Sequence, residues 1–279
     1  MIYVHNVGSV HREEGEELDV KAAWKMVSPA MIRRTDRFIQ LSLLGAYAAI
    51  GEKELERETA LYMASGQGNL AVFKRLRDQR YIKKQPPKPV DFINSLSNTS
   101  GFYVAQFFKI EGKNLNVSRL GFVAETTLLL AQNDLVLNKV EQVLVGGVDE
   151  LQEPFSFTRK TLGISDERPL GEGSNWMLLS RKKEGSLASL EVLKQAMGLD
   201  ELKVYLQQID VTSQLAFGQR CSKEVIEMLL GDKKHFEVSC GFYETASLYL
   251  LNTFIESGKG ELIFVDNYED RYRVVKLNC

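Results

Sequence analysis

The stretch Ser118-Arg-Leu-Gly-Phe-Val-Ala-Glu-Thr-Thr-Leu-Leu-Leu130 decides the fold, because a similar stretch, Ser239-Cys-Gly-Phe-Tyr-Glu-Thr-Ala-Ser-Leu-Tyr-Leu-Leu251, follows later. Each copy has Gly-Phe at the start of an apolar segment that we interpret as a buried helix. Each helix leads to an apolar strand that ends in Val-Asp, at Asp149 and at Asp266. The order Gly-Phe, helix, strand, Asp therefore occurs twice, which predicts a duplicated α/β fold.

Strands and helices alternate along the rest of the chain, which favours an α/β sheet. A helix is expected after Pro29, with Ile32 and Phe38 among its apolar positions, and segment 151–170 is expected to be a loop. The other predicted strands are 2–10, 59–64, 115–118, 143–147, 176–179, 203–209, 261–266 and 271–277. The other predicted helices are 70–79, 92–108, 122–133, 186–197, 222–230 and 243–256.

Composition excludes several classes of protein. The chain has 279 residues, of which 44% are hydrophobic and 26% charged, so it is neither disordered, collagen-like nor a coiled coil as a whole. The 35 basic and 37 acidic residues leave a net charge of −2, which argues against a nucleic-acid-binding protein. We expect one domain, 1–279, with an N-terminal half of about 1–164 and a C-terminal half of about 165–279.

Three cysteines, Cys221, Cys240 and Cys279, are too few for a disulfide framework and favour a reducing compartment. The first residues show no signal-peptide pattern, and the longest nearly apolar run, Leu41 to Ile50, is too short to span a bilayer. We therefore expect a cytoplasmic protein with no membrane span. Neither CxxC nor HxxxH occurs, so we expect no metal and no cofactor.

Three segments resemble the beta-ketoacyl synthase pattern, with spacings that agree over residues 98–150: Asn98 to Phe102, Glu111 to Ser118, and Val143 to Glu150. Pro29 to Phe38 and Gly171-Glu-Gly173 are weaker similarities to the same family. The resemblance implies a thiolase-like fold, in which two duplicated halves form a five-layered αβαβα arrangement.

The departures from that family concern its catalytic residues. Gly121 stands where the family has its nucleophilic cysteine, and glycine has no atom that could act as a nucleophile. Ile209 to Gln214, with Thr212, stands where we expect the first histidine motif, and Phe242 replaces the second histidine. Glu237 replaces the family's lysine. These losses together indicate a degenerate active site.

Members without the cysteine exist in this family as chain-length factors of type II polyketide synthases, of the aromatic-polyketide and aryl-polyene kinds. The resemblance therefore implies a non-catalytic subunit that forms a heterodimer with an active ketosynthase and helps to shape the tunnel for the growing chain. It also implies an interface that includes the strand from Leu115 and the helix 92–108. The expected interface residues are Asn98, Phe102, Leu115, Val117 and Arg119.

Two more sites follow from the same resemblance. Leu96, Thr99 and Tyr103 lie at helical spacing in the expected helix 92–108, and we predict that this face limits chain length. Residues 74–88 contain seven basic residues and one acidic residue. They predict either a solvated surface or a docking site for an acidic acyl carrier protein, with Arg77, Arg80 and Lys83 as contacts.

Two other functions remain open from the sequence. Cys240 or Ser118 could serve an acyltransferase or hydrolase in a remodelled pocket, although a free cysteine more often simply packs. A stand-alone acyl-binding protein is the third hypothesis. His235 lies in a Lys-Lys-His-Phe segment, for which a solvated role is more typical than catalysis.

Overall fold

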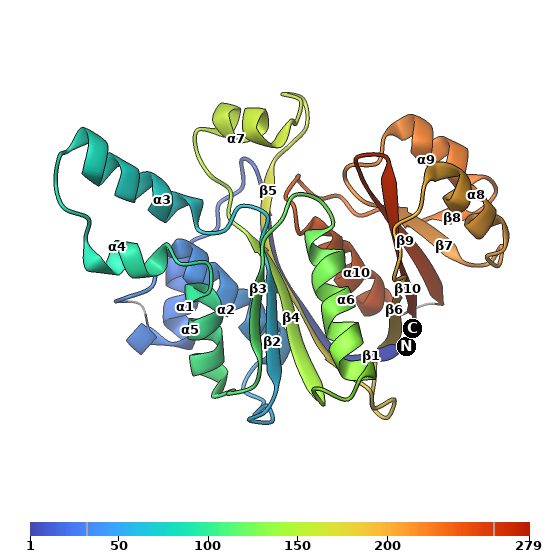
Figure 1. Cartoon of the computed structure of the whole chain (residues 1–279), viewed down its shortest axis with the longest axis horizontal. Coiled ribbons are helices and arrows are strands. Elements are labelled where there is room, and N and C mark those ends of the chain that lie inside the picture. The colour runs from blue at the N-terminus through green and yellow to red at the C-terminus, as the bar shows by residue number, and fades with distance from the viewer. Residues whose placement is uncertain (32, 259) are drawn as a thin grey trace.

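One hydrogen-bonded sheet joins ten strands in the computed structural model, which describes residues 1–31, 33–258 and 260–279 (Figure 1). Ile32, expected in the helix after Pro29, lies outside these residues. The first five strands are β1 (Ile2–Glu13), β2 (Ala60–Ala64), β3 (Asn114–Val117), β4 (Gln142–Asp149) and β5 (Gly171–Ser180). The other five are β6 (Ala188–Val192), β7 (Gln214–Phe217), β8 (Lys234–His235), β9 (Glu261–Tyr268) and β10 (Arg271–Asn278).

The helices lie between these strands. The first half contains α1 (Val20–Val27), α2 (Arg37–Ile50), α3 (Leu70–Arg77), α4 (Pro89–Asn94), α5 (Thr99–Phe108), α6 (Val123–Val136) and α7 (Phe155–Leu162). The second half contains α8 (Leu199–Gln207), α9 (Lys223–Leu230) and α10 (Ala246–Ser257). Short turns of other helix types cover Pro29–Met31 and Asp78–Ile82. Among the described residues, no helix is long and apolar enough to cross a bilayer.

The strand order repeats. The sheet runs β3-β2-β4-β5-β1-β6-β10-β9-β7-β8. When the five strands of each set are numbered in chain order, each set gives 3-2-4-5-1 from its outer edge to the centre of the sheet. The two sets meet at β1 and β6. β2 is parallel to β3 and β4 while β5 is antiparallel to β4 and β1, and the second set shows the same pattern. This confirms the expected duplicated α/β fold. By strand order, the second set begins after Ser180; the division near residue 164 stays a prediction.

The elements form five layers (Figure 1). Helices α1, α2 and α5 cover the outer face of the first strand set, and α8 and α9 cover that of the second. Helices α6 and α10 lie between the two strand sets, where a shared apolar cluster includes Leu128, Leu248 and Phe264. The αβαβα arrangement is therefore confirmed. The central layer matters most for the site, because α6 and α10 are the two helices that the repeated Gly-Phe segments precede.

Two elements after β5 were predicted with the wrong type. The expected helix 186–197 contains strand β6, whose side chains alternate between buried and half-buried positions and which pairs with β1 and β10. The expected strand 203–209 is largely helix α8, which buries Leu202 and Leu206 four residues apart. The Gly198 N–H donates to Glu201 Oε2 at 2.8 Å at the start of this helix.

Two further segments differ from the prediction. The expected helix 92–108 is two helices, α4 and α5, with a break at Ser95–Asn98. Ser95 Oγ donates to the Phe92 carbonyl at 2.7 Å and Thr99 Oγ1 to the Ile93 carbonyl at 2.6 Å, so side chains satisfy carbonyls at the end of α4. The expected loop 151–170 contains α7, and strands β7 and β8 were not predicted.

Candidate functional site

The start of α6 is the place where the resemblance puts the family's nucleophile. Gly121 has a φ of +62° and Phe122, the residue that caps α6, has a φ of 49°. A side-chain carbon at Gly121 would overlap the ring of Tyr268 and would lie 2.7 Å from its Cβ. A cysteine therefore does not fit at Gly121 unless Tyr268 moves, and Phe122 beside it is likewise no nucleophile.

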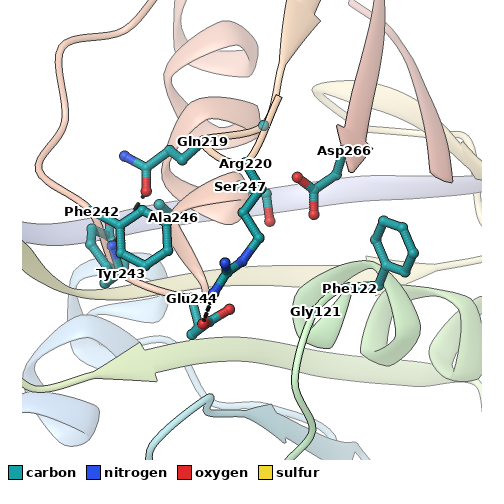
Figure 2. A pocket seen from close by; sticks show the side chains of 11 residues that line it. Gly121, Phe122, Gln219, Arg220, Phe242, Tyr243, Glu244, Ala246, Ser247 and Asp266 are labelled. Atoms are coloured by element: carbon teal, nitrogen blue, oxygen red, sulfur yellow. Dashed lines mark hydrogen bonds and ion pairs between the residues drawn. The ribbon is translucent and has the colours of Figure 1, made fainter. Parts of the chain in front are cut away.

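The pocket at this position is almost closed. Its volume is about 20 Å³, which is room for about one water molecule (Figure 2). Phe122 and Tyr268 pack edge to face with ring centroids 6.2 Å apart, and the guanidinium of Arg273 lies 5.6 Å from the Phe122 ring. The lining residues are Gly121, Phe122, Gly218, Gln219, Arg220, Phe242, Tyr243, Glu244, Ala246, Ser247 and Asp266.

Carboxyl groups gather at this pocket. Glu125 is buried and Asp266 is half-buried. Desolvation raises the pKa of both, and repulsion from Glu125 raises the pKa of Asp266 further. Glu244 forms an ion pair with Arg220, and Figure 2 shows this pair pointing into the space between Phe242 and Asp266. Neither histidine nor cysteine is among the described lining residues. Such an acidic site raises the pKa of a thiol, whereas a nucleophilic cysteine needs a cationic one.

The repeat explains how these carboxyls meet. Asp149, at the end of β4, accepts from the Thr245 N–H at 2.9 Å at the start of α10; burial, and then repulsion from Glu244, raises its pKa to about 6. Asp266, in β9, lies near Glu125 in the first turn of α6 and is repelled by it. Each half therefore places the Asp of its Val-Asp pair against the helix start of the other half.

The four positions that differ from the family's catalytic residues do not all lie at one site in the structure. Gly121 and Phe242 line the same pocket, as expected from the repeat. Thr212 is exposed in the turn before β7, where it bonds to Asp210, so our placement of the first histidine motif at Ile209–Gln214 is wrong. The segment that reaches the pocket is Gly218 to Arg220, directly after β7. Glu237 is exposed and pairs with His235 at 2.8 Å, outside the pocket.

Sequence reasoning missed two residues at this site. Tyr268 fills the position beside Gly121, yet Asn267-Tyr-Glu-Asp270 reads only as a turn after a strand. Gln219 donates to the carbonyls of Cys240 and Gly241 at 2.9 and 3.0 Å, which ties the loop after β7 to the start of α10. The apolar run Leu215 to Phe217 followed by Gly218 is the signal that could have predicted β7 and this loop.

The alternative nucleophiles lie in unfavourable surroundings. Cys240 Sγ is 4.0 Å from His11 Nδ1, a pairing that the sequence spacing did not show. Burial raises the pKa of Cys240 to about 12 and lowers the pKa of His11, so both groups are held neutral. Ser118 is exposed in the loop after β3. Burial and the neighbouring Asp266 raise the pKa of the Cys221 thiol as well.

The expected interface residues lie on one side of the first half. β3 is the last strand at its end of the sheet, and Leu115 and Val117 on it are half-buried. Helix α5 approaches β3 closely at Gly101, where an added side-chain carbon would lie 3.1 Å from Asn114 Oδ1. The exposed expected residues here are Asn98, Phe102 and Arg119, and Leu120 beside them is also exposed.

The expected gate residues do not share one helix. Leu96 is exposed in the break between α4 and α5, whereas Thr99 is buried and Tyr103 half-buried on α5. Tyr103 packs against the outer apolar cluster of the first half and edge to face against Phe102, with ring centroids 5.6 Å apart. The inference that all three form one continuous helix face is therefore wrong, although Thr99 and Tyr103 remain one turn apart.

The basic segment is partly neutralised within the chain. Lys74 donates to the Glu153 carbonyl at 2.9 Å, Arg75 pairs with Asp91 at 3.1 Å and Arg77 pairs with Asp78 at 2.8 Å. Arg80 and Lys83 are exposed. No ion pair within the described part of the chain involves either of them, so together with the exposed Lys84 and Lys88 they carry the available positive charge of this segment.

This arrangement of strands and helices is similar to that of several proteins of known structure. No model of a protein family and no curated protein matches the chain. Among solved structures, the ishigamide ketosynthase/chain length factor matches with a TM-score of 0.77 and 13% identity, over 99% of this chain and 98% of that chain. The chain has the ketosynthase fold. This confirms the thiolase-like fold that the resemblance implied.

Two further structures share this ketosynthase fold. A chain of AntDE:AntF, a type II PKS acyl-carrier protein in complex with its ketosynthase, matches with a TM-score of 0.72 and 12% identity, over 100% of this chain and 99% of that chain. The ketosynthase ApeO in complex with its chain length factor ApeC, from Xenorhabdus doucetiae, matches with a TM-score of 0.58 and 13% identity, over 100% and 99%. At such identities the likeness concerns the fold.

Proposed function

We propose that this chain is a non-catalytic subunit of the chain-length-factor kind, which forms a heterodimer with an active ketosynthase in the cytoplasm. One observation supports the proposal: Gly121, which the resemblance places at the family's nucleophile position, packs against Tyr268 in a pocket of about 20 Å³. The pocket's carboxyls oppose thiolate chemistry, as described above. The subunit would act in type II polyketide biosynthesis, as the names of the solved ketosynthase and chain length factor complexes suggest for those proteins.

The proposed partner surface consists of β3, α5 and the segment that follows each of them. β3 leaves an unpaired edge at the end of the sheet, and such an edge is normally covered or paired. Phe102 and Leu120 are 58% and 65% exposed beside it, and large apolar residues at this exposure are typical of a protein interface. Pairing of β3 with the same strand of a ketosynthase would cover the edge and both side chains.

Co-expression tests the partnership. The chain is produced together with an active ketosynthase of the same organism, and affinity purification of one subunit is expected to recover the other in equal amount. Phe102→Asp should abolish co-purification, because a charge would be buried in the interface. Val204→Asp, which changes a 56% exposed residue on α8 of the second half, is the matched control and should leave it intact. If the wild-type subunits do not co-purify, the proposal fails.

The tunnel role is tested through product length. In the active complex, Leu96→Ala or Tyr103→Ala is expected to lengthen the product, because a smaller side chain leaves space at the end of the tunnel. Thr99 lies between these two residues in the chain and belongs to the same proposed gate. Mass spectrometry of the products measures the chain length. A product profile identical to that of the wild-type complex would exclude this face as the gate.

A further inference from the structure

A second cavity lies next to the filled pocket. It has a volume of about 810 Å³, within the range of small-molecule sites, and opens between α9, the start of α10 and loops 165–169 and 236–240. Gly218, Gln219, Ala246 and Ser247 line both spaces. The ketosynthase fold of this chain therefore has little room on one side of the start of α10 and ample room on the other.

One wall of this cavity is apolar. Ile226 from α9, Leu250 from α10 and Phe264 from β9 line it, together with Phe236, whose ring packs edge to face on Phe254 with centroids 5.1 Å apart. Phe264 is fully buried behind this wall, whereas Ile226, Leu250 and Phe236 are half-buried and supply its accessible surface. These side chains come from three rigid elements of the second half and its central layer. The wall suits a hydrocarbon group, since transfer of apolar surface from water onto it is favourable.

The opposite side carries a cation that lacks a carboxylate. The guanidinium of Arg168 lies 4.9 Å from the ring centroid of Phe242, and that of Arg220 lies 5.1 Å from the same ring. Arg220 has Glu244 as its ion-pair partner. Among the described ion pairs none involves Arg168, and burial and repulsion by Arg220 lower its pKa.

The other charged groups at this cavity do not neutralise Arg168. Glu237 pairs with His235, Glu167 is exposed on the rim, and Lys223 at the start of α9 adds a second positive charge. Arg168 is half-buried, and a guanidinium in such a place binds a carboxylate in a bidentate, charge-assisted manner. An anion at Arg168 would offset both its burial and the repulsion from Arg220.

We propose that this cavity binds a small amphipathic carboxylate, with the carboxylate on Arg168 and the hydrocarbon tail on Ile226, Leu250 and Phe236. The site belongs to the second half, whereas the proposed partner surface, β3 and α5, belongs to the first. Ligand binding and heterodimer formation can therefore be tested separately. Failure of one leaves the other standing.

Octanoate is the probe, and calorimetric titration into the full-length chain measures its affinity. We expect saturable binding of one octanoate per chain at sub-millimolar concentration, and weaker binding of 1-octanol, which has the same tail without the charge. Arg168→Gln should weaken octanoate binding about tenfold or more and leave octanol binding unchanged. Arg33→Gln, at an exposed arginine that belongs to none of the proposed sites, is the matched control and should bind octanoate as the wild type does.

The apolar wall has its own test. Ile226→Asp should weaken the binding of both octanoate and octanol, since it places a charge beside the tail. Arg168→Lys, which keeps the charge, should lose less affinity than Arg168→Gln, and thermal unfolding identifies any variant that does not fold. The proposal is overturned if the wild type does not bind octanoate below millimolar concentration, if octanoate and octanol bind equally, or if Arg168→Gln or Ile226→Asp binds octanoate like the wild type.

Discussion

A single methyl group at Gly121 tests whether the nucleophile position is filled. Gly121→Ala adds one carbon at a backbone φ of +62°, and that carbon would overlap the ring of Tyr268. The left-handed conformation costs an alanine about 1–2 kcal/mol. Overpacking of a filled site costs about 1–3 kcal/mol more. We therefore expect the free energy of unfolding to fall by about 2–5 kcal/mol.

Gly163→Ala separates the two contributions. Gly163 has a φ of +68°, and nothing lies within 4 Å of a carbon added there, so this variant bears the conformational cost alone. Urea unfolding followed by circular dichroism gives both free energies at matched conditions. The difference between the two variants, about 1–3 kcal/mol, measures the overlap with Tyr268.

Removal of the ring completes the cycle. Tyr268→Ala alone should destabilise the fold, because the ring packs on Phe122 and lies 5.8 Å below the guanidinium of Arg220. In the Gly121→Ala background, the same change should cost about 1–3 kcal/mol less, since it also relieves the overlap. Equal costs for Gly121→Ala and Gly163→Ala, with no coupling to Tyr268, would show that the position has room. The main support for the non-catalytic assignment would then be lost.

Three more outcomes are expected. Burial raises the pKa of Glu150 from 4.5 to about 7, so the protonated carboxyl stabilises the fold at low pH. This contribution to the free energy of unfolding, about 3 kcal/mol, is lost as the pH rises through about 7. Glu150→Gln should flatten this pH dependence in urea unfolding. Iodoacetamide should label Cys240 slowly by intact mass, because its pKa of about 12 leaves little thiolate; rapid selective labelling would favour an enzyme. Reversal of Arg77, Arg80 and Lys83 to Glu should weaken binding of the acyl carrier protein at low salt, and unchanged affinity would leave these residues as a solvated surface.

The repeated segments were predictable because their signals are local and strong. Strand β4 is buried throughout and apolar up to Asp149, and α6 and α10 are apolar segments that follow Gly-Phe. Region 186–209 was misassigned because its signals conflict: Leu187, Leu190 and Leu193 repeat at helical spacing, yet Ala188–Val192 pairs between two strands. Strands far along the chain that pair with such a segment determine whether it is a strand or a helix, and a local sequence pattern does not reveal these partners.

Only the site residues that belong to the two repeated segments were predictable from the sequence. Gly121 and Phe242 follow from the two Gly-Phe segments, and the structure brings both to one pocket. Thr212 failed because β7 was not recognised, which displaced the expected motif to the wrong end of that strand. Tyr268 and Arg168 act through contacts with residues more than a hundred and more than seventy positions away, so only the three-dimensional structure shows them.

The pocket beside Gly121 is filled by other side chains and is not left as an empty cavity. Loss of a nucleophile alone would leave a cavity, and cavities in a packed interior are destabilising. Here Tyr268 and Phe122 occupy the space. The buried Glu125 and the half-buried Asp266 have raised pKa values, at a cost in stability that close packing alone does not require. Asp149 differs, because four donors on Ser65, Gly66, Gln67 and Thr245 hold its carboxyl between the halves. The same repeated position thus joins the two halves at Asp149 and closes the site at Asp266. The proposed non-catalytic subunit would need the first of these contacts to hold its halves together, and the second would keep the space beside Gly121 filled.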